Sequence, residues 1–142
     1  MPTVTFILGY CGSGKTHLAD EMVRTLGVKT FDEGFAIDPA KRAELIADLR
    51  KGTDCAVVEI AFCFNGPREA FVDQLRREVS GVTIKTEYFE ADLDKANENC
   101  RRRKNKGDAE AHVTINTHRI GSGYRIPPGV TPREIHPLPK ES

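Results

Sequence analysis

The 142-residue chain lacks the features that mark several large classes of protein. Lys and Arg total 21 and Asp and Glu total 21, so no net charge favours nucleic acid or an acidic partner. No apolar run approaches the length of a membrane span, and no charged stretch of a secretory signal stands at the start. Internal repeats and low-complexity segments are absent from the sequence as well. We therefore expect one globular domain, residues 1–142, with no membrane partner.

The four cysteines form neither a metal motif nor a disulfide framework. None belongs to a C-x-x-C pair and none has a His at a ligand spacing, which argues against a zinc site. A chain of this length also buries enough apolar surface to fold without disulfides. The cysteine pattern predicts reduced thiols and a cytoplasmic location.

What the sequence does contain is a complete phosphate-binding loop, G-x-x-x-x-G-K-[ST], at Gly9–Thr16. Its glycines let the backbone curl around a phosphate with the N–H groups turned inward. The Lys of the motif would reach the β- and γ-phosphates of ATP, and the hydroxyl of the Thr would take a place on Mg²⁺. We expect the cofactor to be bound by Gly12, Ser13, Gly14, Lys15 and Thr16.

The surroundings of the motif predict an α/β fold, because a short apolar run precedes the loop and a helical apolar pattern follows it. The same alternation continues along the chain, and the continuously apolar third strand is typical of a parallel sheet covered on both faces. The expected strands are residues 4–8, 28–31, 55–62 and 82–89, with a possible fifth at 133–136; the expected helices are 17–26, 39–51, one opening at 65–67, one from about 92, and a weaker one at 113–124.

Acidic residues follow two of these strands, at the sheet edge where ligands bind in such folds. Asp32 could accept the proton of an incoming hydroxyl or orient that hydroxyl, and Glu33 could take this role in its place. The alternative is that Asp32 is an ordinary acidic residue of a turn. Glu59 closes an apolar run, where a carboxylate is costly without a partner. A Mg²⁺-bound water would be such a partner, as for a Walker B acid, and the alternative is an ion pair with an Arg.

A basic cluster at residues 101–106 also has two interpretations. At an exposed helix end, cations simply favour the negative pole of the helix. Beside a nucleotide they could cover the phosphates and offset the charge on the leaving group. Arg101 and Arg103 cannot share one helical face, and we favour Arg103 as the catalytic one. The N-K-x-D match at 105–108 lacks the D-x-x-G partner motif of GTPases, so we interpret it as accidental.

An acceptor substrate could lie at the mouth of the third strand, where Phe64 and Arg68 are found. Phenylalanines at such positions pack into a core more often than they stack on a base. Both residues, together with Glu33, remain candidates for substrate binding.

Together, the Gly9–Thr16 loop, Asp32, Glu59 and the arginines of residues 101–108 resemble the small P-loop kinase group. This group includes nucleoside monophosphate, gluconate and shikimate kinases, zeta-toxin kinases and polynucleotide 5′-hydroxyl kinase. The resemblance covers about residues 3–127 and ends in Tyr124-Arg125-Ile126-Pro127. It implies a three-layer sandwich with a parallel sheet of order 2-3-1-4, a mobile lid at about 101–112 and an irregular tail at 125–142.

The resemblance implies transfer of the γ-phosphate of Mg·ATP to a hydroxyl or phosphate. The acceptor would be a small molecule or a nucleotide. Two alternatives stay open: a kinase acting on DNA or RNA, at a 5′-hydroxyl or a modified base, and an ATP-binding or ATPase module without an acceptor. The Asp-x-Arg expected of a polynucleotide kinase after the second strand is replaced by Asp32-Glu33-Gly34, so the acceptor is open.

Overall fold

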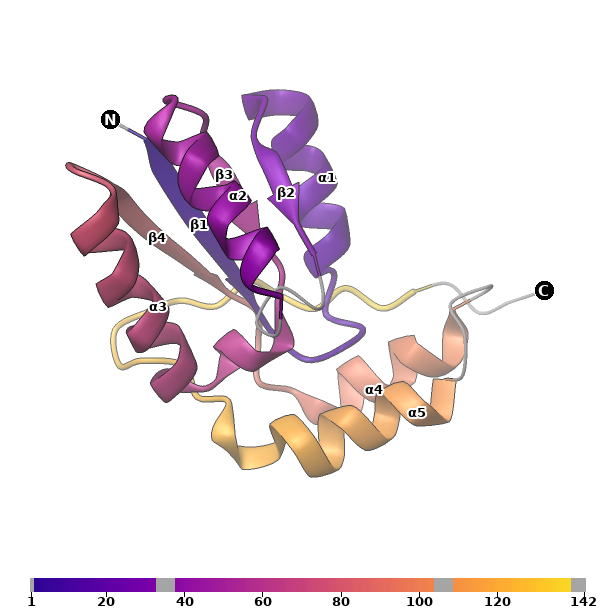
Figure 1. Cartoon of the computed structure of the whole chain (residues 1–142). Helices are drawn as coiled ribbons and strands as arrows, with labels where there is room; N and C mark the ends of the chain where they lie inside the picture. The colour runs from indigo at the N-terminus through magenta and orange to yellow at the C-terminus, as the bar shows by residue number, and fades with distance from the viewer. Residues whose placement is uncertain (1, 33–37, 104–108, 139–142) are drawn as a thin grey trace.

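The computed structural model describes residues 2–32, 38–103 and 109–138 and shows an α/β sandwich (Figure 1). Its centre is a parallel four-stranded sheet in the order β2-β3-β1-β4, which confirms the predicted order. Crossover helices connect the parallel strands, so the carboxyl ends of all four strands meet at one edge. The strands are β1 (Thr3–Leu8), β2 (Lys29–Phe31), β3 (Cys55–Val57) and β4 (Thr83–Tyr88).

Strand β1 lies inside the sheet, paired with β3 on one side and β4 on the other. Its residues from Val4 to Leu8 are buried, as expected for a strand covered on both faces. Phe6 packs into the larger apolar cluster with side chains of α2 (Pro39–Arg50) and α3 (Asn65–Glu78). Ile7 faces the other way, toward α1 (Lys15–Leu26). Because successive side chains of β1 point to opposite faces of the sheet, this one strand packs against the helices on both sides.

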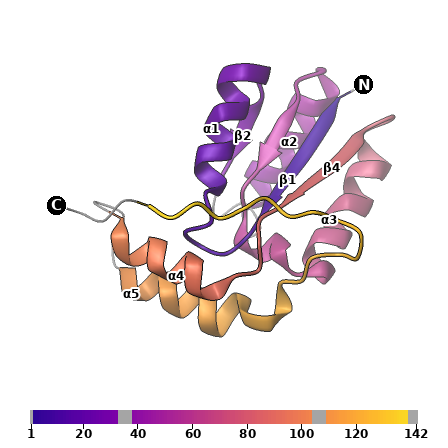
Figure 2. The same cartoon turned by 180° about the vertical axis from the view of Figure 1, so that it is seen from behind.

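Two further helices, α4 (Leu93–Arg102) and α5 (Ala109–Thr114), lie across the carboxyl end of the sheet (Figures 1 and 2). Helix α5 continues directly into a π-helix, Ile115–Ile120, and then a 3₁₀ turn, Gly121–Gly123. Within the described residues, none of the helices combines the length and apolar character needed to cross a membrane.

Capping residues account for several helix boundaries that the sequence predicts. Gly27 ends α1 in a left-handed conformation, φ +69°, and its N–H donates to the carbonyl of Val23. Asp38 begins α2 by accepting a hydrogen bond from the N–H of Ala40, ahead of Pro39 at the first helical position. Asp92 caps α4 in the same way.

The third strand is shorter than predicted, because β3 ends at Val57 and the apolar run continues as a 3₁₀ turn, Ile60–Cys63. The N–H of Val58 still bonds to the carbonyl of Phe31, the last residue of β2. The residues beyond remain buried by another route, since Phe62 stacks on Phe71 of α3 with centroids 5.4 Å apart. Hydrophobicity alone does not separate a strand from a buried turn.

The end of the chain differs from prediction in two places. The last helix begins at Ala109, before the predicted Val113, and changes to π geometry at Ile115. The possible fifth strand is a single parallel bridge between Arg133 and Phe89, flanked by the hydrogen bonds of Arg133 N–H to Tyr88 and of Glu90 N–H to Arg133. The tail therefore follows the end of β4 without extending the sheet.

Candidate functional site

The phosphate loop connects β1 to α1 at the carboxyl edge of the sheet. Two of its glycines have left-handed backbone angles, with φ +89° at Gly12 and φ +105° at Gly14, which side chains rarely adopt. Lys15 begins α1; only 8% of it is exposed, and its Nζ donates to the carbonyl of Gly9 at 2.7 Å. The ammonium group thus folds back over the loop at the positive end of a helix, the arrangement that binds anions.

The back of this loop is in close contact with α4. A Cβ added at Gly12 would lie 2.3 Å from the carbonyl oxygen of Ala96 and 3.1 Å from Sγ of Cys100. Only a glycine allows the two backbones to approach so closely. The second glycine is less crowded, because a Cβ at Gly14 would meet only the ring of Phe89, at 3.6 Å.

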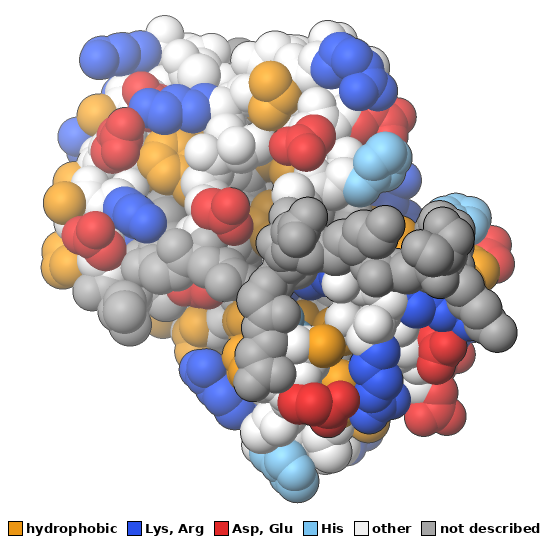
Figure 3. Space-filling view, turned by 90° about the vertical axis from the view of Figure 1, so that its right-hand side faces the viewer, with side chains coloured by type: hydrophobic (Ala, Val, Ile, Leu, Met, Phe, Trp, Pro, Cys, Tyr) orange, Lys and Arg blue, Asp and Glu red, His pale blue; other side chains and the backbone are white. Residues whose placement is uncertain are grey.

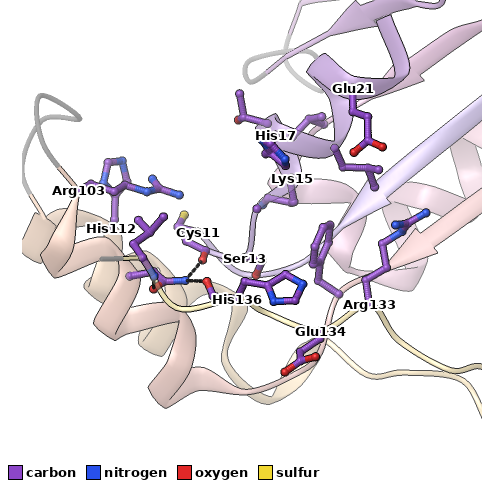
Figure 4. Close-up of a pocket in the computed structure, with 18 of the residues that line it drawn as sticks. Cys11, Ser13, Lys15, His17, Glu21, Arg103, His112, Arg133, Glu134 and His136 are labelled. Carbon is purple, nitrogen blue, oxygen red and sulfur yellow. Dashed lines mark hydrogen bonds between the residues drawn. The ribbon is translucent and has the colours of Figure 1, made fainter. Parts of the chain in front are cut away.

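A cavity of about 850 Å³ opens over the loop (Figure 4). It brings together three parts of the predicted site from distant stretches of sequence: the loop itself, Asp32 after β2, and Arg103 after α4. A cavity of this size is typical of a small-molecule or cofactor site. The other lining residues come from α1, from positions just beyond β3 and β4, from α4 and α5, and from the tail: His17, Leu18, Glu21, Val58, Phe89, Asn99, His112, Arg133, Glu134, His136 and Leu138.

The loop has polar groups that suit a phosphate. The hydroxyl of Ser13 is buried and has no hydrogen-bond partner within the described residues, although it lines the cavity. An unpartnered buried hydroxyl is costly, and a phosphate oxygen would supply the missing acceptor. Thr16, in the first turn of α1, is exposed and lines the cavity.

The two predicted acids occupy different surroundings. Asp32 is exposed and lines the cavity, whereas Glu59 is 7% exposed and is not among the lining residues. Glu59 stands two residues beyond β3, and its carbonyl accepts the N–H of Phe62 at the start of the 3₁₀ turn. Within the described residues, no group of three or more His, Cys, Asp or Glu side chains could hold a metal ion. Mg²⁺ bound with a nucleotide needs only one or two protein ligands, and its other ligands are phosphate oxygens and water.

The arginines at the end of α4 point in different directions, as the helical spacing suggests. Arg101 pairs with Glu110 at 3.3 Å, and Arg102 pairs with Glu98 at 2.8 Å. Arg103, the favoured residue, is half-buried and lines the cavity. Glu33 and the N-K-x-D stretch lie outside the described residues, as does the middle of the expected lid.

Comparisons with known proteins agree with this architecture. No protein-family model matches the chain, and no curated protein sequence matches it. A sugar kinase from Janibacter sp. HTCC2649 superposes with a TM-score of 0.57 at 14% identity, covering 95% of this chain and 83% of that one. A gluconokinase from Sinorhizobium meliloti 1021 superposes with a TM-score of 0.54 at 14% identity, covering 94% and 83%. The chain has the P-loop kinase fold.

In this P-loop kinase fold, two predicted substrate residues have structural contacts outside the cavity lining. Arg68 lies in the first turns of α3, and its guanidinium donates to the carbonyl of Phe62 at 2.7 Å and to Oδ1 of Asn65 at 2.5 Å. Phe64 precedes α3, and its ring fills the space beside Gly123. Neither Phe64 nor Arg68 is among the residues that line the cavity with the loop, Asp32 and Arg103.

Sequence reasoning missed the polar residues that hold the back of the loop. Asn99 of α4 donates to the carbonyls of Gly12 and His136, at 3.0 and 2.9 Å, and accepts the N–H of Leu138. Asn116 of the π-helix bonds to Cys11 and is fully buried. A signal existed, because Asn99 stands beside Cys100 on the apolar side of α4, where a polar residue needs a partner. The partner itself could not be read from the sequence.

Two cysteines from other elements contact the same loop. Sγ of Cys63 donates to the carbonyl of Gly9 at 3.5 Å, and Sγ of Cys100 donates to the carbonyl of Cys11 at 3.3 Å. Burial raises the pKa of both the Cys63 and the Cys100 thiol, so both keep the proton that these hydrogen bonds need. Burial also raises the pKa of Cys55, in β3, to about 12. Cys11, by contrast, lines the cavity.

Proposed function

We propose that the protein is an ATP-dependent phosphotransferase that moves the γ-phosphate of Mg·ATP to a hydroxyl or phosphate of a small-molecule or nucleotide acceptor. The observation that carries the proposal is the cavity, where the phosphate loop, an acid and an arginine from three separate stretches of chain meet. The P-loop kinase fold supports it, since this fold presents ligands at the carboxyl edge of the sheet.

In this proposal, the loop amides from Gly12 to Thr16 and the Lys15 ammonium bind the phosphates of ATP. The hydroxyl of Thr16 would hold Mg²⁺ directly, and Glu59 would hold a water molecule on the ion. The metal offsets negative charge on the phosphates when it is bound. Lys15 needs only to exchange its hydrogen bond with Gly9 for one with a phosphate oxygen.

In this proposal, Asp32 acts on the acceptor, and its position on the cavity wall supports that role. The acceptor oxygen attacks the γ-phosphorus, the bond from that phosphorus to the β–γ bridging oxygen breaks, and ADP leaves with that electron pair. When the acceptor is a hydroxyl, Asp32 orients it and takes its proton. Arg103 offsets the negative charge that builds on the leaving β-phosphate.

A small acceptor fits the surface better than a nucleic acid does. Figure 3 shows Lys and Arg side chains interspersed with Asp and Glu over the face in view. A duplex or single strand usually requires a continuous basic groove, and its binding depends strongly on salt.

The experiment that tests the function is a transfer assay with γ-labelled ATP and Mg²⁺. Acceptors are offered in separate reactions: sugars and sugar acids, nucleosides, nucleotides and oligonucleotides with a free 5′-hydroxyl. Label should move to one small-molecule class, and the Lys15→Met variant should give none. Label on oligonucleotides alone would identify a nucleic-acid kinase, and acceptor-independent hydrolysis would identify an ATPase module; either result contradicts the proposal.

A further inference from the structure

The back of the phosphate loop is held by a side chain that stands 105 residues away in sequence. Asn116 is 0% exposed, and its amide bonds to both backbone groups of one loop residue. The N–H of Cys11 donates to Oδ1 of Asn116 at 2.7 Å, and Nδ2 of Asn116 donates to the carbonyl of Cys11 at 2.9 Å. One side-chain amide thus pairs with Cys11 as a neighbouring strand would.

The orientation of this amide is fixed by its surroundings. The second hydrogen of Nδ2 goes to Oδ1 of Asn97 on α4, at 2.9 Å, and Sγ of Cys100 lies 3.8 Å from the same nitrogen. Turning the amide over would place its oxygen against two acceptor oxygens and its NH₂ group against the N–H of Cys11. The oxygen and both hydrogens of the Asn116 side-chain amide are hydrogen-bonded, and two of these three bonds go to Cys11 of the loop.

We propose that Asn116 is a positioning residue for the phosphate loop, setting the backbone of Cys11 so that the following amides are ready for a phosphate. The inference rests on the proposed nucleotide-binding function of that loop. The backbone N–H and the carbonyl of Cys11 both bond to Asn116, so the N–H of Cys11 is not available to a ligand. The bend of the loop therefore begins after Cys11. The next residue is Gly12, at φ +89°, whose carbonyl is held in turn by Asn99.

The segment that carries Asn116 has an unusual conformation. A π-helix is rare, and short π segments within helices are often found at functional sites. Here it spans Ile115–Ile120, and Ile120 anchors it by full burial in the main apolar cluster. Buried Asn116 and buried Ile120 lie in one short helix, one bonded to the loop and the other packed in the core, so they form a matched pair for mutation.

The test compares Asn116→Leu with Ile120→Val. Leucine has a similar size and none of the hydrogen bonds, so the loop should lose its preorganised shape; Asn116→Ser is a milder second variant. Amide hydrogen exchange at Cys11 without ligand reports the contact directly and should be slow in the wild type and fast in both Asn116 variants. The dissociation constants of Mg·ADP and of inorganic tripolyphosphate should rise at least about tenfold in both variants, as expected when backbone groups lose buried partners.

The control Ile120→Val should lower the melting temperature by an amount comparable to Asn116→Ser, while both dissociation constants stay within about twofold of wild type. Equal ligand affinity in the Asn116 variants and the wild type, or a Cys11 amide that stays protected, would overturn the inference. Failure of the proposed function looks different: a wild-type protein that binds Mg·ADP and transfers no phosphate contradicts the kinase activity but leaves the role of Asn116 measurable. Wild-type protein that binds neither ligand overturns both.

Discussion

Adding one methyl group at Gly12 should disrupt the contact between the phosphate loop and α4. The left-handed angle, φ +89°, costs an alanine about 1–2 kcal/mol. Its Cβ would also lie 2.3 Å from the carbonyl oxygen of Ala96, a backbone atom of a helix, which cannot rotate away as a side chain would. Overpacking of a tight interior costs about 1–3 kcal/mol, so Gly12→Ala should lower the free energy of unfolding by about 2–5 kcal/mol in all.

Gly52, after α2, provides the matched control. Its φ is +88°, almost the same, but an added Cβ would have no atom of the described residues within 4 Å. Gly52→Ala should therefore carry the backbone cost alone, about 1–2 kcal/mol. Both variants also restrict the unfolded chain equally, so this effect cancels in the comparison.

The measurement is urea unfolding of the two variants and the wild type, with titration of Mg·ADP into each folded protein. Gly12→Ala should be less stable than Gly52→Ala by about 1–3 kcal/mol, and it alone should lose nucleotide affinity. Equal stability of the two variants would show that α4 does not touch the loop as described. A normal affinity for Mg·ADP in Gly12→Ala would show that this contact does not shape the nucleotide site.

Three further predictions concern the site. Lys15→Met keeps the aliphatic packing and removes the charge, so it should abolish γ-phosphate transfer and leave the circular dichroism spectrum unchanged; normal turnover would rule out the proposed role of the loop. Asp32→Asn should reduce kcat by about 10²–10⁴-fold without weakening ATP binding. Glu59→Gln should instead lower both the affinity for Mg·ATP and kcat. A near-normal kcat in Asp32→Asn would leave the base unassigned. An alkylating reagent followed by peptide mass mapping should modify Cys11 before Cys55, whose burial raises its pKa to about 12, and Mg·ATP should protect Cys11; equal rates with and without nucleotide would contradict this.

Much of the fold could be predicted because its signals are local. The strand before the loop, the helix after it and caps such as Gly27 and Asp92 are determined by residues within a few positions. The end of β3 was not predictable in this way, because the apolar run continues beyond Val57 into the 3₁₀ turn Ile60–Cys63. A run of apolar residues reports burial, and only the partner strand decides between strand and turn.

In the candidate site, too, local signals predict some residues, whereas others depend on distant partners. The loop residues follow from a motif, and Asp32 and Arg103 follow from their places after a strand and a helix; the cavity brings these together. The pairing of Asn116 with Cys11 has no such signal, because an isolated asparagine has many uses and its partner is 105 residues away. Arg68 shows the opposite case, a residue with the right charge at the right sheet edge whose hydrogen bonds are structural.

The large sequence separation of these contacts determines when the site can form during synthesis. Cys11 is made early, but Asn116 follows 105 residues later, and the hydroxyl of Tyr124, which contacts the carbonyl of Leu8 at the end of β1, later still. At about 5–20 residues per second, a ribosome needs roughly 5–20 s to cover that distance. Nascent chains that already contain the whole motif should not bind nucleotide until the π-helix has emerged. The site that comes first in the sequence would be among the last parts of the protein to mature.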